Sequence, residues 1–414
     1  MPVMLPVPRY FFALRWLTLA ALFVGFSASR ALLSMSLLGF ALNELRYGSL
    51  TRRLRCWLRQ PYGVVFTFLF WVPALTFFWS SNTVAWANQM LILLPLLLLP
   101  LLTAVPPPLH VHERNGIALA FIAVIVAGTL YSTAAYLLAA ERYHAVYDKA
   151  KIFVTPASGD YVRFSWAVCI ALLLGLHLLR QNTGWRALHK AVLGGALLWL
   201  VLYLHLLGSK TGMLGSYLVL GGNAVVLLQK RQWRVAGLLL AAMVVAPVVA
   251  YYLFPTFQLR LRYISWDVEH YIQGRYIEGL SDGNRILSAR AALELLRHYW
   301  PAGVGFGDVF TAMQQWYAAN APWMPRAEML YPANQWLQYA LGAGVAGAAV
   351  VTVAVLWPFF QKQWPLNYYV FHALCVFTML YENSLGQQYG VFLYGFFIWY
   401  FAATLQHTHS SKQA

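Results

Sequence analysis

Charged residues are scarce in this sequence. They make up 10% of its 414 residues, whereas 60% of the residues are hydrophobic. This balance excludes a soluble globular protein of such length, because apolar runs long enough to span a bilayer recur throughout the chain. Acids are scarcer than bases, and the net charge is +16. Basic cytoplasmic loops explain that excess in a membrane protein, so we expect no nucleic-acid partner.

Other features are missing as well. The three cysteines, Cys56, Cys169 and Cys375, are too few and too scattered for a disulfide framework. The first apolar segment lacks a small-residue cleavage site, so we expect a retained membrane helix. The segments expected outside the bilayer contain no Asp pair and no Asp/His cluster. We therefore expect metal-independent chemistry without a cofactor.

Twelve apolar runs are candidate membrane helices. The sequence predicts an all-α polytopic membrane protein, with helices 1–9 in residues 1–254, a large loop over 255–333, and helices 10–12 with a cytoplasmic tail in 334–414. The runs cover about 10–27, 31–45, 62–79, 86–105, 116–140, 163–179, 191–208, 212–229, 235–254, 334–358, 366–382 and 388–405.

The charge of the short loops predicts the orientation. Cations gather on the side of the two termini, in loops near 46–59, 180–190 and 230–234 and at Lys362. The short loops on the opposite side hold few cations. The positive-inside rule therefore predicts cytoplasmic termini and an outer, periplasmic large loop.

The large loop is the one long polar segment. It contains seven arginines, seven acids and no lysine. Arginine is preferred where planar, bidentate contacts to phosphate or carboxylate are needed. We interpret this loop as the lid and part of the active site of a membrane enzyme that acts on a pyrophosphate-linked lipid.

Two helices are expected in the loop. Apolar residues recur at helical spacing from Ile286 to Trp300, which predicts an amphipathic helix on the membrane surface or against the bundle. Three glycines between 303 and 307 predict a flexible turn, and Asp308 is a candidate cap for a helix through about Asn320. Arg285 and Arg290 lie near the start of the first helix, where backbone N–H groups also favour an anion. We predict that both bind pyrophosphate.

Four further residues are candidates for the site. Lys210 lies at the outer junction of two membrane helices, and Arg163 begins another at the same level. Each is either a phosphate contact or a basic residue that extends to the interface. Glu382, at the end of a membrane segment, favours pairing with an arginine over catalysis. His298 is expected at the surface. Glu382 and His298 are nevertheless the alternative candidates for the general base of the reaction.

Three local motifs are similar to those of the bacterial O-antigen ligase and polymerase superfamily. Residues 209–214, SKTGML, resemble a motif of a basic residue, three intervening residues and a Leu, usually written with Arg. Arg285 followed by residues 303–307, GVGFG, resembles an Arg-then-Pro-Gly-x-Gly segment. Residues 332–344 resemble a His-Asn-x-x-Leu motif in which ten residues separate the His from a Gly. The predicted topology, with one large outer loop late in the chain, agrees.

Two positions depart from this pattern. Lys210 stands where Arg is usual, so the charge is kept but the bidentate fork is lost. Ala333 stands where the family has His, which is thought to act on the acceptor hydroxyl, and alanine cannot replace it. Either the chain is naturally altered or the alanine was introduced to trap an inactive state. The intact Asn334 and Gly344 favour the second reading.

The resemblance implies a C-type glycosyltransferase-like membrane fold. It implies transfer of a polysaccharide from an undecaprenyl-pyrophosphate donor to a sugar hydroxyl of lipid A–core, with the tails held among membrane lipids and apolar grooves. Position 333 and Asn334 would orient the acceptor, while Lys210, Arg285, Arg290 and Arg163 would bind the pyrophosphate. The alternatives are an O-antigen polymerase, a protein O-oligosaccharyltransferase and, from another class, a lipid or polysaccharide transporter.

Overall fold

The computed structural model describes residues 9–46, 49–105, 109–144, 154–181, 184–274, 281–361 and 364–410. This part of the chain is helical and contains no strand. Lys362 and the last four residues, which the sequence analysis assigns to the cytoplasmic side, lie outside these ranges.

Nine helices in the described ranges are long and apolar enough to cross a bilayer, which indicates a polytopic membrane protein. They are α1 (Arg9–Ala28), α4 (Pro61–Leu75), α5 (Thr83–Ala104), α6 (Val111–Leu138), α8 (Tyr161–Gln181), α9 (Ala187–Leu207), α10 (Lys210–Gln229), α11 (Trp233–Leu253) and α15 (Gln335–Leu356). The other three predicted segments are helices too: α2 (Arg30–Leu45), α16 (Leu366–Tyr381) and α17 (Gln388–Ser410).

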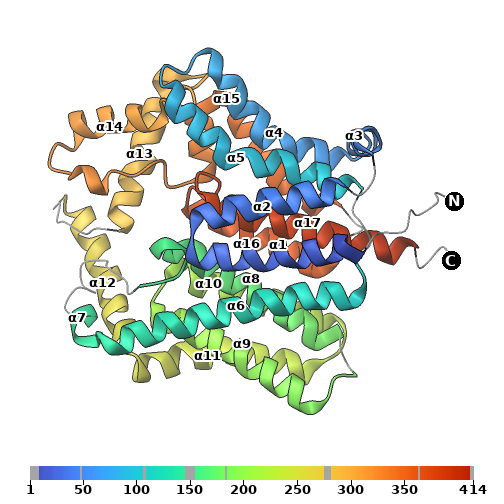
Figure 1. Ribbon diagram of the computed structural model, residues 1–414. Coiled ribbons are helices and arrows are strands. Elements are labelled where there is room, and N and C mark those ends of the chain that lie inside the picture. The colour runs from blue at the N-terminus through green and yellow to red at the C-terminus, as the bar shows by residue number, and fades with distance from the viewer. Residues whose placement is uncertain are drawn as a thin grey trace.

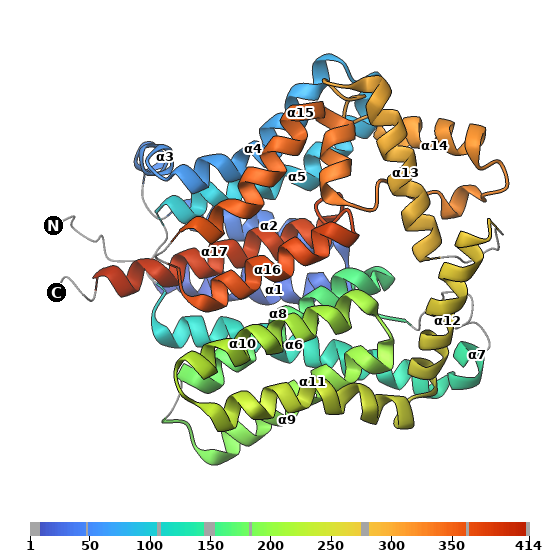
Figure 2. The ribbon, with the colours of Figure 1, turned by 180° about the vertical axis from the view of Figure 1, so that it is seen from behind.

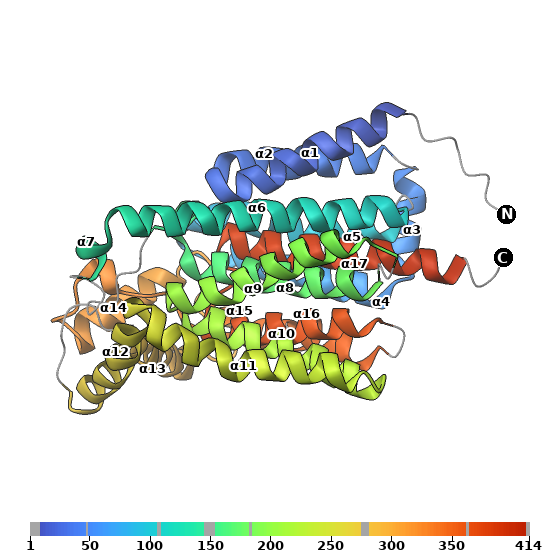
Figure 3. The same ribbon diagram turned by 90° about the horizontal axis from the view of Figure 1, so that it is seen from below.

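These helices form a bundle with two different ends (Figure 1). Both termini and the short helix α3 (Leu50–Leu58) lie at one end. At the other end lie α7 (Ala140–His144), α12 (Pro255–Ile272), α13 (Asp282–Tyr299) and α14 (Val309–Asn320). The view from behind and the view from below show the same separation (Figure 2, Figure 3). Residues 255–274 and 281–333 therefore cap the bundle end opposite the termini.

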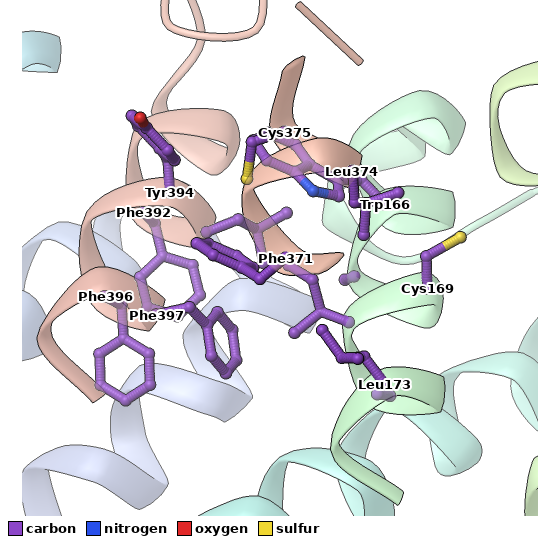
Figure 4. Close-up of a cluster of buried hydrophobic side chains, with 14 of the residues drawn as sticks. Trp166, Cys169, Leu173, Phe371, Leu374, Cys375, Phe392, Tyr394, Phe396 and Phe397 are labelled. Atoms are coloured by element: carbon purple, nitrogen blue, oxygen red, sulfur yellow. The ribbon is translucent and has the colours of Figure 1, made fainter. Parts of the chain in front are cut away.

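The core of the bundle is aromatic. Figure 4 shows part of it, where side chains from α8 pack against α16 and α17. Phe371 and Leu374 of α16 are fully buried, as are Phe396 and Phe397 of α17. The rings of Phe396 and Phe397 meet edge to face at 5.2 Å between centroids. This packing holds the ends of α8 and α16 in fixed relation, and both ends carry polar residues of the candidate site.

The glycines after α13 have a different role from the flexible turn expected. Val304 N donates to Leu341 O at 2.8 Å, and Gly305 N donates to Gly342 O at 3.0 Å. Gly344, at φ +61°, interrupts α15 at this point, and Val345 N donates to Pro301 O at 2.9 Å. The turn is locked onto α15, because only glycine permits such close backbone approach.

One other expectation for the cap is corrected. Asp308 precedes α14 as predicted, but its carboxylate accepts from Ser81 N at 2.6 Å and Asn82 N at 3.1 Å instead of capping its own helix. Of the two places expected for the apolar stripe of α13, the bundle is not the one it contacts, because Ile286 and Leu293 are exposed; a place on the membrane surface stays a prediction. The face that packs consists of small residues: Gly283, Asn284, Ser288, Ala291 and Ala292.

Candidate functional site

Lys210 lies at the capped end of the bundle because of the turn before it. Gly208, at φ +66°, ends α9 in the left-handed conformation that favours glycine. Ser209 then caps α10, with its side chain accepting from Gly212 N at 3.3 Å. Lys210 is thus the first helical residue, and its ammonium forms an ion pair with Asp282 at the start of α13.

Asp282 also joins Lys210 to Arg285. The two α13 residues are one turn apart, and Asp282 Oδ1 lies 3.6 Å from Arg285 Nη1. Arg285 continues to Glu382, which follows α16: its Nε donates to Glu382 Oε1 at 3.1 Å, and its Nη2 contacts the same oxygen. Ser281 Oγ accepts from Arg285 Nη1 at 2.8 Å. Burial disfavours the charged guanidinium, but the Glu382 carboxylate outweighs that cost and raises the pKa of Arg285.

Arg163 occupies the other side of Glu382. Its Nη1 lies 3.6 Å from Glu382 Oε2 and 3.6 Å from Asp160 Oδ1, just before α8. Its Nη2 donates to Asn383 O at 2.8 Å. Its side chain is 11% exposed, whereas that of Lys210 is 22% exposed. Arg163 is therefore the more deeply anchored of the two.

These contacts form one continuous row of alternating charge, which we call the charge row. In order, it consists of Lys210, Asp282, Arg285, Glu382, Arg163 and Asp160. The row brings together α8, the α9–α10 junction, α13 and the α16–α17 loop. Each inner carboxylate is shared between two cations, and the three cations of the row are balanced by its three carboxylates.

The backbone N–H groups at the start of α13 are already occupied. Asp267 of α12 accepts from Ser281 N at 3.1 Å, from Asp282 N at 2.8 Å and from Gly283 N at 3.2 Å. Asp267 is fully buried. The expectation that this helix start offers its N–H groups to a ligand is therefore wrong, because a carboxylate of the chain itself satisfies them.

Arg290 and His298 lie outside the charge row. The side chain of Arg290 is 64% exposed and pairs with Glu294 at 2.9 Å, one turn along α13. His298 is exposed near the far end of the same helix. Thirteen residues separate it from Arg285, which places it about 20 Å along the helix axis at the usual rise per residue. The structure does not bring either residue to the charge row.

Position 333 lies beside α13. Ala333 N donates to Ser288 Oγ at 3.1 Å, and Ser288 is one turn after Arg285. Asn334 caps α15, since its Oδ1 accepts from Leu337 N at 3.0 Å, while its Nδ2 donates to Leu380 O at 3.0 Å. Both ends of the Asn334 amide are thus engaged. Asn334 holds the start of α15, and position 333 is left half-buried beside the row.

Sequence reasoning missed two parts of this site. It gave Asp282 and Asp267 no role, although Asp282 stands three residues before Arg285, a spacing that places both on one helical face. It also missed Arg260 of α12, which is 3% exposed. Little in the sequence singles out Arg260, because α12 was not predicted and Arg260 is one of seven arginines in residues 255–333.

No protein-family model matches the chain, and no curated protein sequence matches it. Among the described residues, no group of three or more His, Cys, Asp or Glu side chains is arranged to hold a metal ion. Metal-independent chemistry stays a prediction. The function is therefore argued from the charge row and its surroundings.

Proposed function

We propose that the chain is a membrane glycosyltransferase of the O-antigen ligase type. Its donor is a polysaccharide on undecaprenyl pyrophosphate, and its acceptor is a sugar hydroxyl of lipid A–core. The observation that carries the proposal is the charge row. Three of the four cations predicted to bind pyrophosphate, Arg163, Lys210 and Arg285, come from distant parts of the sequence and meet at one end of the bundle.

The reaction needs little covalent help from the protein. The acceptor hydroxyl oxygen forms a bond to the anomeric carbon of the donor, while the bond from that carbon to the pyrophosphate oxygen breaks. The leaving pyrophosphate takes the electron pair, and the hydroxyl proton passes to a base or to water. The cations stabilise the charge that develops on the leaving group, and the cap holds donor and acceptor together.

Ala333 impairs this reaction in the present chain. Position 333 lies beside the row, where a side chain could reach an acceptor hydroxyl, but a methyl group can neither accept nor orient the proton. Glu382 is a poor replacement, because its carboxylate oxygens are already engaged by Arg285 and Arg163. The chain as written is therefore proposed to bind donor and to transfer slowly or not at all.

We further propose twelve crossings, cytoplasmic termini and a periplasmic cap in a bacterial inner membrane. The basic short loops on the side of the termini support this orientation. Cysteine labelling in intact cells tests it, in a Cys56→Ser background. Asn320→Cys in the cap should react with an impermeant maleimide, whereas Arg55→Cys on α3 should react only after permeabilisation. The reverse pattern would refute the orientation.

Glycan transfer tests the reaction class. Membranes containing the Ala333→His variant should move glycan from lipid-linked donor to lipid A–core, detected as a mobility shift of the acceptor. Growth of the donor glycan itself would indicate a polymerase, and modification of a Ser- or Thr-containing peptide would indicate a protein oligosaccharyltransferase. Movement of donor across the bilayer without any tagged acceptor would indicate a transporter.

A further inference from the structure

Arg260 is a buried cation beside the charge row. It lies on α12 and is 3% exposed. Within the described part of the chain, its Nε and Nη1 have no hydrogen-bond partner. Its guanidinium carbon lies 4.9 Å from the ring centroid of Tyr263, a contact that uses the face of the group and does not satisfy these two nitrogens. A buried charge without hydrogen-bonded partners is costly, so its retention requires a reason.

The surroundings of Arg260 place it at the Lys210 end of the row. Both ends of α12 fix this placement: Thr256 Oγ1 donates to Leu206 O at 2.8 Å, shortly before the Lys210 turn, and Asp267 accepts from Asp282 N at 2.8 Å at the start of α13. The carboxylates of this region are those of Asp267 and Asp282. Neither carboxylate is free for Arg260: Asp267 accepts from three backbone N–H groups of α13, and Asp282 is shared between Lys210 and Arg285. Both carboxylates are thus engaged elsewhere, and Nε and Nη1 of Arg260 keep no hydrogen-bond partner among the described residues.

We propose that Arg260 is an anion-binding residue and that it binds, together with Lys210, a phosphate group of the ligand. A guanidinium donates two parallel N–H groups to phosphate oxygens, and an ammonium adds a compact charge. The identification of this phosphate with donor pyrophosphate rests on the proposed function. In that case Arg260 and Lys210 contact one phosphate and Arg285, across Asp282, contacts the other.

Binding measurements on the purified full chain test this role. The protein is placed in phosphatidylcholine nanodiscs and titrated by calorimetry with inorganic pyrophosphate and, separately, with farnesyl pyrophosphate. Arg260→Gln should weaken binding about ten- to a hundredfold, the usual effect of losing a charge-assisted phosphate contact. Arg260→Lys should recover part of that loss. Arg262→Gln removes the same charge from an exposed position of α12, and should change affinity by less than about twofold.

Melting temperatures without ligand separate binding from a structural role. Removing an unsatisfied buried charge should leave the melting temperature of Arg260→Gln unchanged or raise it. A marked fall would overturn the proposal, because Arg260 would then stabilise the fold. Unchanged affinity for both probes in Arg260→Gln would overturn it as well, as would equal losses in Arg260→Gln and Arg262→Gln.

The arms of the experiment also identify the source of the phosphate. A loss in Arg260→Gln seen with both probes assigns Arg260 to the phosphate itself, and a loss seen with farnesyl pyrophosphate alone assigns it to a lipid-linked ligand. Phosphatidylglycerol that competes with pyrophosphate in the parent but not in Arg260→Gln would assign a bilayer headgroup. Glycan transfer is not a readout here, so failure of the ligase proposal leaves this result interpretable.

Discussion

Replacing Arg285 with alanine should remove most of the pyrophosphate affinity and leave the fold intact. Arg285 is the centre of the charge row, with Glu382 on one side and Asp282 on the other. Losing a charge-assisted contact to phosphate in a shielded site costs roughly 1.5–3 kcal/mol, or about ten- to a hundredfold in affinity. The effect on stability is smaller, because Glu382 retains Arg163 at 3.6 Å and Asp282 retains Lys210.

Two further variants isolate the effect. Arg290→Ala removes an equal charge from the same helix at an exposed position, so its pyrophosphate affinity should stay within about twofold of the parent. Arg285→Ala combined with Glu382→Gln removes both the cation and its buried carboxylate. That double variant should recover melting temperature without recovering affinity, because it removes the carboxylate that lost its Arg285 contacts and does not restore a cation.

Calorimetric titration with farnesyl pyrophosphate measures the affinity of each variant, and melting curves without ligand measure its stability. Equal losses in Arg285→Ala and Arg290→Ala would refute a localised site, since general electrostatics would then explain the affinity. Recovery of affinity in the double variant would also refute the reasoning. It would mean that Arg285 only neutralises Glu382 and does not contact the ligand.

Three predictions concern the scaffold, each measured by thermal unfolding. Arg15→Leu removes the two hydrogen bonds, of 2.7 and 3.1 Å, that Arg15 donates to the buried Glu44 carboxylate, and should lower the free energy of unfolding by about 3–5 kcal/mol. Replacing both Arg15 and Glu44 by leucine should restore most of that stability. If the double variant recovers nothing, the loss does not come from the unpaired carboxylate. Gly344→Ala should destabilise the protein, because a Cβ there would lie 1.7 Å from Pro301 O and the residue has a φ of +61°. Gly194→Ala is the control and should not destabilise it, because no atom lies within 4 Å of a Cβ at that position. Equal effects of the two substitutions would contradict the packing argument. Asp267→Ala removes the cap of α13 and should cost about 1–2 kcal/mol, with faster amide exchange at 281–283; unchanged exchange there would contradict the capping role.

The helix pattern of the bundle could be predicted because it depends on composition alone. Each of the twelve predicted apolar runs overlaps a helix, since a chain in hydrocarbon must satisfy its backbone internally. Lys210, Arg163 and Glu382 could also be selected, because charges at the ends of apolar helices are costly without partners. Their mutual contacts depend on how the helices pack, and no local pattern encodes that.

The cap was less predictable for the same reason. Helix α12 was not predicted, because its buried face includes Thr256, Arg260 and Asp267, which a search for apolar periodicity does not count. The apolar stripe of α13 did not identify the face that packs on the bundle, because that contact uses small residues such as Ser288 and Ala291. Close packing of backbones favours small residues over large apolar ones, which periodicity analysis overlooks.

The central claim is that this bundle end binds lipid-linked pyrophosphate and lacks only the acceptor-activating group at position 333. Glycan transfer to lipid A–core by the chain as written and by Ala333→His, at matched expression in the same membranes, tests it most directly. A positioned acid–base group contributes roughly 10²–10⁴-fold, so the histidine variant should be active where the alanine chain is nearly silent. Robust transfer with alanine at 333, unchanged by histidine, would contradict the account.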